Sequence, residues 1–336
     1  MAAQSLASLV APSGGRLDAR CSDRGDARHP VALSNANLRR IVDNGLQVAA
    51  VDAASADSIG YLARILVLTN LPHRDPGDIL AWTRRNGDFT LQITPGVAPA
   101  TAVEPARRLG IPYGTYPRLV LSWVTTEVLR TRSPELVLGQ SLAEFLRRLG
   151  VHRTGGEQGT IGRVREQLRR LFAATISWTY QRGNVQLEAG VRPFEGVFTF
   201  WDPTRPHQDA VFPSRLVLNQ RLFEEILRSS VPFDLRVVRE LARQHNCLGI
   251  DLYGWLTHKQ FQLARTGRSA LVPWTSLAQQ FGGDYGRTRD FKRRFLAALT
   301  VVERLYPGAM AVPQARGLFI RPGATAVAAR RTELVG

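Results

Sequence analysis

The sequence contains little cysteine and no long hydrophobic segment. Its only two cysteines, Cys21 and Cys247, lie far apart in 336 residues and form no disulfide or metal-binding pattern. This usage is typical of a protein that works in a reducing cytoplasm. No run of about 18 apolar residues is present, which argues against a membrane-spanning helix, and the first residues lack the basic segment and apolar core of a secretory signal. We therefore expect a cytoplasmic protein without a membrane partner.

Lysine is equally scarce, and its positions exclude one class of enzyme. Only Lys259 and Lys292 occur, and neither belongs to the Gly-x-x-x-x-Gly-Lys-Ser/Thr loop of an ATPase. The six histidines contain no His-x-His pair of the kind that strand-nicking enzymes use, and the sequence has no Asp-x-Asp pair of a two-metal primase or polymerase. We expect no enzymatic activity, no cofactor and no bound metal.

Basic residues are abundant, and nearly all of them are arginine. The chain has 44 lysines and arginines against 28 acidic residues, a formal net charge of +16 and a pI of about 11.1. Such a charge favours an acidic polymer as partner, nucleic acid before an anionic membrane. The planar guanidinium group suits this partner, because it donates two parallel hydrogen bonds to phosphate or to guanine. Double-stranded DNA is the expected partner.

The chain begins with a segment of low periodicity that precedes a longer ordered part. Residues 1–58 are rich in alanine, serine, glycine and aspartate, and we expect them to be mostly disordered, with a short helix near residues 34–46. A strand is predicted next over residues 60–72. Residues 82–94 predict a hairpin, because the Asn-Gly pair at their centre tolerates the positive φ of a tight turn.

A basic amphipathic helix is the main feature of the first half of the ordered part. Residues 159–180, GTIGRVREQLRRLFAATISWTY, place apolar side chains on one helical face and arginines on the other. A short basic helix over residues 141–149 precedes it, with Ser141 as its N-cap and Gly150 at its end. A hairpin is expected over residues 184–201. Helix, basic helix and hairpin in this order are typical of a winged helix-turn-helix domain.

The second half repeats this layout without sequence identity between the halves. Helices are expected over residues 234–245, 248–261, 276–281 and 287–306, with a short strand near residue 271 and a hairpin over residues 309–321.

The predicted fold class is therefore α+β, a helix-rich tandem of two winged helix-turn-helix modules. The expected domains are a disordered N-terminal segment (1–58), a first winged-helix domain with an N-terminal hairpin (59–213), a second winged-helix domain (214–322) and a flexible tail (323–336).

Basic side chains on the two long helices are the candidate DNA contacts. On the second helix, Arg289 and Arg293 lie four residues apart, opposite the apolar face and within the first two turns, the part that such proteins place against base edges. On the first helix, the interleaved Glu166 favours contacts with phosphate. The expected DNA-binding residues are Arg287, Arg289, Lys292 and Arg293 for the major groove, and Arg163, Arg165, Arg169 and Arg170 chiefly for phosphate.

Several longer segments resemble one known family. The segments are GIPYGTYPRLVLSWVTTEVLRTRSPELVLGQSLAEFLRRLG, the basic helix that follows it, the earlier LPHRDP and RRNGDFTLQI, and the later DLYGW. Together they closely resemble the plasmid-encoded RepA proteins, over about residues 58–322. The resemblance implies a plasmid replication initiator that binds repeated origin sites, represses its own gene, and recruits the host initiator and the replicative helicase. Because no motor motif is present, we expect strand separation at the origin to come from binding energy, supercoiling or host proteins.

Two other classes of protein remain open. A dimeric winged-helix transcriptional regulator would bind a palindrome, whereas an initiator that binds as a tandem monomer would bind directly repeated, asymmetric sites. A nuclease or primase would show metal-dependent turnover. The apolar helix expected over residues 117–130 could serve a homodimer or the core, and we favour the core.

Overall fold

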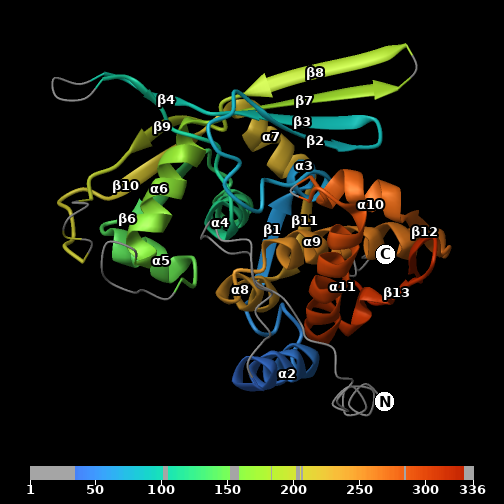
Figure 1. The fold of residues 1–336 in the computed structure, drawn as a ribbon. Coiled ribbons are helices and arrows are strands. Elements are labelled where there is room, and N and C mark those ends of the chain that lie inside the picture. The colour runs from blue at the N-terminus through green and yellow to red at the C-terminus, as the bar shows by residue number, and fades with distance from the viewer. Residues whose placement is uncertain are drawn as a thin grey trace, which may run out of the picture.

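The computed structural model describes residues 35–328 except for 101–104, 152–158, 183, 202–204, 206 and 284. Residues 1–34 of the expected disordered segment and the end of the expected tail lie outside the described residues. The described part is a mixed fold of helices and strands, which confirms the α+β prediction at that level. In Figure 1, one group of elements lies to the left of α4 and another to its right.

The elements to the left form a first unit around α4, with a three-stranded antiparallel sheet of order β6-β10-β9. Ser141 caps α5 as predicted, because its side chain accepts a hydrogen bond from the backbone N–H of Glu144. In chain order the elements are α4 (Thr115–Thr131), β6 (Glu135–Gly139), α5 (Leu142–Arg148), α6 (Thr160–Ala173), β9 (Phe194–Phe198) and β10 (Ser214–Leu218).

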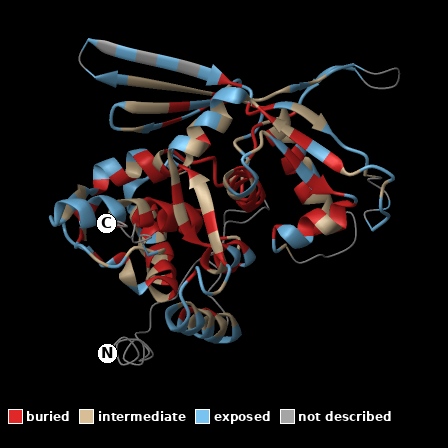
Figure 2. Cartoon of the chain, turned by 180° about the vertical axis from the view of Figure 1, so that it is seen from behind, coloured by how far each residue is buried: buried red, intermediate tan, exposed pale blue. Residues whose placement is uncertain are grey.

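A long hairpin is inserted into this unit between α6 and β9. It extends a second antiparallel sheet of order β2-β3-β7-β8. The hairpin projects from the body (Figure 2), and few of its described residues are buried. The turn at Asn86 and Gly87 is confirmed, and Gly87 has a φ of 59°. The strands are β2 (Trp82–Asn86), β3 (Phe89–Thr94), β7 (Thr175–Arg182) and β8 (Val185–Val191).

Three predictions in this region are wrong. The helix predicted over residues 159–180 ends at Ala173, because the β-branched and aromatic residues after it pair with β3 as strand β7. The hairpin predicted over residues 184–201 does not form: β8 pairs with β7, and β9 pairs with β10. The strand predicted over residues 60–72 ends after a few residues, where the chain enters a short helix.

That first short strand joins the two halves of the chain. β1 (Ile59–Ala63) pairs antiparallel with β11 (Ser230–Asp234), and α3 (Arg64–Leu68) follows β1 directly. Helix α7 (Gln220–Arg228) leads into β11 from the first unit.

The elements to the right of α4 form a second unit, which from α9 onward has the same order of helices and strands as the first. Its sheet is antiparallel with order β12-β14-β13, and Asp234 caps α8 as predicted by accepting from the N–H of Arg236. The elements are α8 (Leu235–Arg243), α9 (Cys247–Thr266), β12 (Ala270–Pro273), α10 (Trp274–Phe281), α11 (Thr288–Leu305), a 3₁₀ turn (Pro307–Ala309), β13 (Ala311–Pro313) and β14 (Gly317–Ile320).

Residues 35–58, which we expected to be mostly disordered apart from a short helix, pack on this second unit. The helix is present as α2 (Asn35–Ala50). At Gly45 a Cβ atom would lie 2.3 Å from the carbonyl oxygen of Arg304, so glycine permits the close approach of α2 to α11. Arg40 and Asn44 donate to the Glu240 carboxylate on α8 at 3.1 and 2.7 Å.

Helix α4 belongs to the core, as predicted. Leu121, Val124 and Val128 are almost fully buried, and the ring of Trp123 meets Phe145 edge to face at 5.1 Å. Buried residues gather in two apolar clusters (Figure 2), and α4 contributes most of its buried residues to the cluster of the first unit and Leu119 to that of the second. None of the described helices has both the length and the apolar composition needed to cross a bilayer.

Candidate nucleic-acid interface

The first turns of α11 present three arginines to solvent. Phe291 and Phe295 are buried on the apolar face of the helix, and Arg287, Arg289 and Arg293 are exposed. Arg293 shares an ion pair of 3.8 Å with Asp290, in which both side chains are about half exposed or more. These guanidinium groups lie at the positive end of the helix dipole, where phosphate is favoured.

Lys292 lies in a different environment from these arginines. It is half-buried, and its ammonium group stands 4.7 Å from the ring centroid of Trp274, the first residue of α10. This cation–π contact ties the start of α11 to α10. The structure therefore brings the four predicted residues of this helix together, three on the surface and one against an aromatic ring.

The arginines of α6 also differ in how far their side chains are exposed. Arg165 and Arg169 are exposed and one turn apart, and Arg163 is half-buried. Arg170 is held inside the protein: it donates to Glu166 at 2.9 Å, to Asp75 at 3.2 Å and to a backbone carbonyl. Burial alone would lower the pKa of Arg170, but Glu166 and Asp75 raise it above its usual value. Two of the predicted phosphate contacts of α6, Arg165 and Arg169, are thus exposed on the surface.

A cleft of about 540 Å³ lies beside α6. Arg165 and Arg169 form part of its wall together with Arg192, which is exposed between β8 and β9, while Glu195 is its acidic wall residue. A small arm of two paired strands, β4 (Val97–Ala98) and β5 (Arg107–Arg108), borders the same cleft. The cleft thus combines three cations with an apolar floor.

Sequence reasoning missed Arg192 as part of this surface. Pro193 gives a local signal that a strand ends at Arg192, because proline has no N–H to donate to a neighbouring strand. A residue at such a strand end is expected to be exposed. Its position next to α6, however, depends on the fold alone, because β9 returns to the three-stranded sheet after the inserted hairpin.

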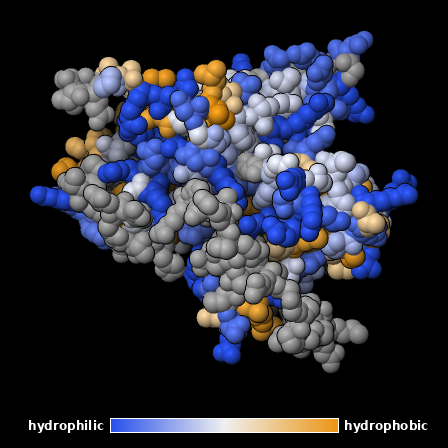
Figure 3. All heavy atoms as spheres, viewed as in Figure 1, coloured by the Kyte–Doolittle hydropathy of each residue, from blue (hydrophilic) through white to orange (hydrophobic). Residues whose placement is uncertain are grey.

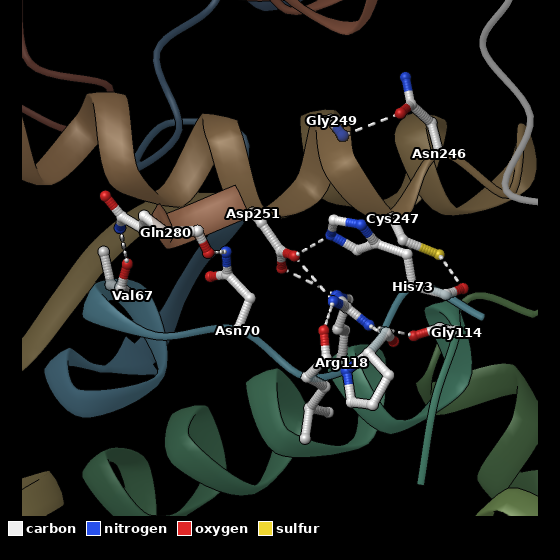
Figure 4. Close-up of polar contacts among 12 residues, drawn as sticks. Val67, Asn70, His73, Gly114, Arg118, Asn246, Cys247, Gly249, Asp251 and Gln280 are labelled. Atoms are coloured by element: carbon white, nitrogen blue, oxygen red, sulfur yellow. Dashed lines mark hydrogen bonds and ion pairs between the residues drawn. The ribbon is translucent and has the colours of Figure 1, made fainter. Parts of the chain in front are cut away.

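A buried polar cluster connects the two units (Figure 4). Arg118 on α4 donates to both carboxylate oxygens of Asp251 on α9 at 2.8 and 2.7 Å, and His73 Nε2 lies 2.9 Å from the same carboxylate. Arg118 also donates to the carbonyls of Leu71, Pro72 and Gly114 at 2.6 to 3.2 Å. Burial alone would raise the pKa of Asp251, but Arg118 and His73 lower it below its usual value of 3.8.

Further contacts fix the second unit against the β2-β3-β7-β8 sheet and α3. Gln280 at the end of α10 donates to the carbonyl of Leu68 at 3.1 Å. Arg84 on β2 is buried, with its guanidinium 4.5 Å from the ring of Trp82. It lies directly against Gly283 in the turn between α10 and α11, where a Cβ atom would collide with it. The turn before α11 is therefore seated on a sheet formed by the other half of the chain.

Three of the segments that carry the family resemblance meet at this cluster. LPHRDP contains His73, GIPYGTYPR ends at Arg118, and DLYGW begins at Asp251. These segments are far apart in the sequence, so their convergence follows from the fold. Among the described residues, no group of three or more histidines, cysteines or acidic residues could hold a metal ion.

The chain is thus a basic α+β protein of two units, and the buried contacts between the units hold the unit of α6 against that of α11. Residues 111–275 match the family model described as plasmid encoded RepA protein. This match confirms, over that part of the chain, the resemblance drawn from the sequence. The match supports the role in plasmid replication that this resemblance implies.

Solved structures also show similarity to the chain. A crystal structure of selenomethionine derivatives of domains 2 and 3 of RctB aligns at 11% identity with a TM-score of 0.46, covering 76% of this chain and 93% of that one. A second crystal structure of RctB domains 2–3 aligns at 11% identity with a TM-score of 0.45, covering 76% and 96%. No curated protein matches the sequence.

Proposed function

We propose that the chain is a plasmid replication initiator that binds origin DNA through two winged-helix modules. The observation that carries this proposal is the shared order of parts in both units. From α4 in the first unit and from α9 in the second, the elements run helix, strand, helix, helix, strand, strand, apart from the inserted β7-β8 hairpin and the 3₁₀ turn, and each sheet has the order first, third, second strand. In both units the third helix, α6 or α11, carries exposed arginines. This is the helix that a winged helix-turn-helix places in the major groove.

In this proposal α11 supplies sequence preference. Arg287, Arg289 and Arg293 contact bases, because they are exposed in the first turns of a helix whose other face is buried. A bidentate arginine to guanine is worth about 1–3 kcal/mol of discrimination. Lys292, held over Trp274, adds charge toward the phosphates at the edge of the groove.

The first unit supplies mainly phosphate contacts. The DNA phosphates are contacted by Arg163, Arg165 and Arg169 of α6 and, across the cleft, by Arg192. Arg170, with its partners inside the protein, holds α6 in position against Asp75. Phosphate contacts dominate the affinity, so with about 6–10 of them binding falls roughly 10³–10⁵-fold between 50 and 200 mM salt.

The experiment that tests this function is selection of random duplex DNA by the full-length chain at about 150 mM salt, where nonspecific binding is weak. An asymmetric consensus of about 20 base pairs supports two modules on successive major grooves. A palindromic consensus supports the alternative, a dimeric regulator, and the absence of any consensus refutes sequence-specific binding.

The remaining parts of the initiator role follow from the family. We propose that the DNA-bound chain recruits the host initiator and the replicative helicase, represses its own gene, and has no enzymatic activity of its own. Capture of host proteins on a supercoiled origin plasmid, with and without the chain, tests recruitment. ATP- or Mg²⁺-dependent turnover by the purified chain would refute the non-enzymatic role.

A further inference from the structure

The connection between β9 and β10 carries an exposed apolar patch. Four large side chains lie there: Phe198 is 53% exposed, Phe200 48%, Val211 87% and Phe212 63%. We call these four residues the wing patch. Figure 3 shows hydrophobic atoms at the left edge of the molecule, where β9 and β10 end (Figure 1). Exposed aromatic rings of this kind in a cluster indicate a binding surface.

The wing patch is held by specific contacts at its base. The Phe200 N–H donates to Ser214 Oγ at 2.9 Å, and the Ala210 N–H donates to the carbonyl of Gln140 at 2.9 Å. Between them, Trp201 donates from Nε1 to the Gly139 carbonyl at 3.1 Å and stacks on Phe145 at 5.7 Å. The centroids of the Phe200 and Phe212 rings lie 5.9 Å apart. The rings are therefore presented to solvent on a fixed support.

Positive charge borders the wing patch on the side of α6. Thr199 and Trp201, which alternate with the exposed phenylalanines, line the cleft that holds Arg165 and Arg169. On the other side Phe198 is the cross-strand partner of Arg215, whose half-exposed guanidinium donates to Glu135 at 2.7 Å. Apolar rings beside guanidinium groups suit a DNA groove, because the guanidinium groups can contact the phosphates while the rings contact the apolar base faces that an opened base step exposes.

We propose that the wing patch is an apolar wedge that enters the minor groove beside the segment held by α6. Phe200 and Phe212 insert against a base step and open its stacking, while Arg165 and Arg169 hold the adjacent phosphates. The inference rests on the proposed DNA binding and deepens it. Insertion of apolar side chains unstacks a base step at a cost of a few kcal/mol and kinks the duplex. This gives a chain without an ATPase loop a way to use binding energy for local opening of the origin.

The test compares two duplexes that differ in two central base pairs, fully paired in one and mismatched in the other. Because the mismatch is already unstacked, a wedge binds the mismatched duplex at least about tenfold more tightly. The F200A/F212A variant of the full-length chain loses this preference and keeps its affinity for the paired duplex within a few-fold. The matched control is Phe261→Ala, since Phe261 is also about half exposed but lies on α9. This control keeps the preference for the mismatched duplex. The fluorescence of a 2-aminopurine beside the site, which increases when the base unstacks, rises on binding of the control as it does on binding of the wild type.

The outcomes separate the wedge from DNA binding itself. Equal affinity of the wild type for both duplexes, or a preference that F200A/F212A retains, overturns the wedge and leaves the proposed function intact. Failure of the wild type to bind either duplex overturns the proposed function and the wedge with it. If F200A/F212A changes only the sedimentation of the free chain, the wing patch is a protein contact and the wedge is refuted. Thermal unfolding of each variant confirms that these surface changes leave the fold intact.

Discussion

The guanidinium of Arg118 donates from Nε and Nη2 to the two carboxylate oxygens of Asp251, at 2.8 and 2.7 Å, across 133 positions of sequence. Both side chains are more than nine tenths buried. Bidentate charge-assisted pairs of this geometry are strong and directional. Since α4 packs in the first unit and α9 in the second, this pair links the unit that carries α6 to the unit that carries α11.

Removing the carboxylate should destabilise the whole chain. Asp251→Ala leaves Arg118 buried without its main partner, and breaking a buried pair in this way costs about 3–5 kcal/mol. The matched control is Glu127→Ala, which removes an ion pair with the exposed Arg130 and should cost about 0–1 kcal/mol. Urea unfolding measures both. An Asp251→Ala loss no larger than that of the control would contradict the assigned role.

Rigid coupling of the units also predicts a fixed spacing of the DNA contacts. Insertion of about five base pairs into the middle of the selected site turns one half by half a helical turn. The two modules can then no longer bind together, and affinity should fall about 10²–10⁴-fold. Electrophoretic mobility shifts on spacer variants measure this. An affinity independent of spacing would mean that the units move freely about each other.

Local patterns allowed most helices to be predicted, whereas strands that depend on distant partners were misassigned. Thr175 and Trp178 continue the helical spacing of α6, so the sequence alone favours a longer helix. In the fold, Trp178 pairs with Leu91, and Ile176 pairs with Ile93. The pairing residues come from a hairpin more than 80 positions earlier, and no local rule indicates that pairing.

The candidate site shows the same division between local and distant information. Helical periodicity placed Arg165 and Arg169 on the exposed face correctly, because one turn of helix determines it. Whether Arg170 faces DNA or the protein depends on Asp75, which is 95 residues away. The exposed Arg192 and the buried partners of Arg118 likewise gave no periodic signal in the sequence.

Arginine substitutions on α11 should relax sequence preference. Arg289→Ala and Arg293→Ala each remove an exposed guanidinium from the first turns of the helix, and each should lose about 1–3 kcal/mol of discrimination between the selected site and random duplex. Fluorescence anisotropy with both duplexes at one salt concentration measures the ratio. If both duplexes weaken equally, α11 contacts phosphate and not bases.

Arginine substitutions on α6 should act on all sequences alike. R165A/R169A removes two phosphate contacts, so the slope of log K against log salt should decrease by about 1.8, with specificity unchanged. Arg170→Ala serves as a contrast, because it removes ion pairs with Glu166 and Asp75 and should mainly lower the unfolding temperature. A change in specificity with unchanged salt slope in R165A/R169A would place base contacts on α6 instead.

Glu303 on α11 should make stability depend on pH, because burial raises its pKa from 4.5 to about 7. Between these values the folded chain binds a proton that the unfolded chain has lost. The contribution of Glu303 to the free energy of unfolding is therefore fully present below pH 4.5 and is lost as the pH rises through 7. Glu303→Gln removes this dependence. The urea midpoint of the variant minus that of the wild type should therefore increase between pH 4.5 and 7 and stay constant above pH 7. The exposed Glu224→Gln on α7 should show no such gain, and a pH-independent difference for Glu303→Gln would mean that this carboxyl is ionised in the folded chain.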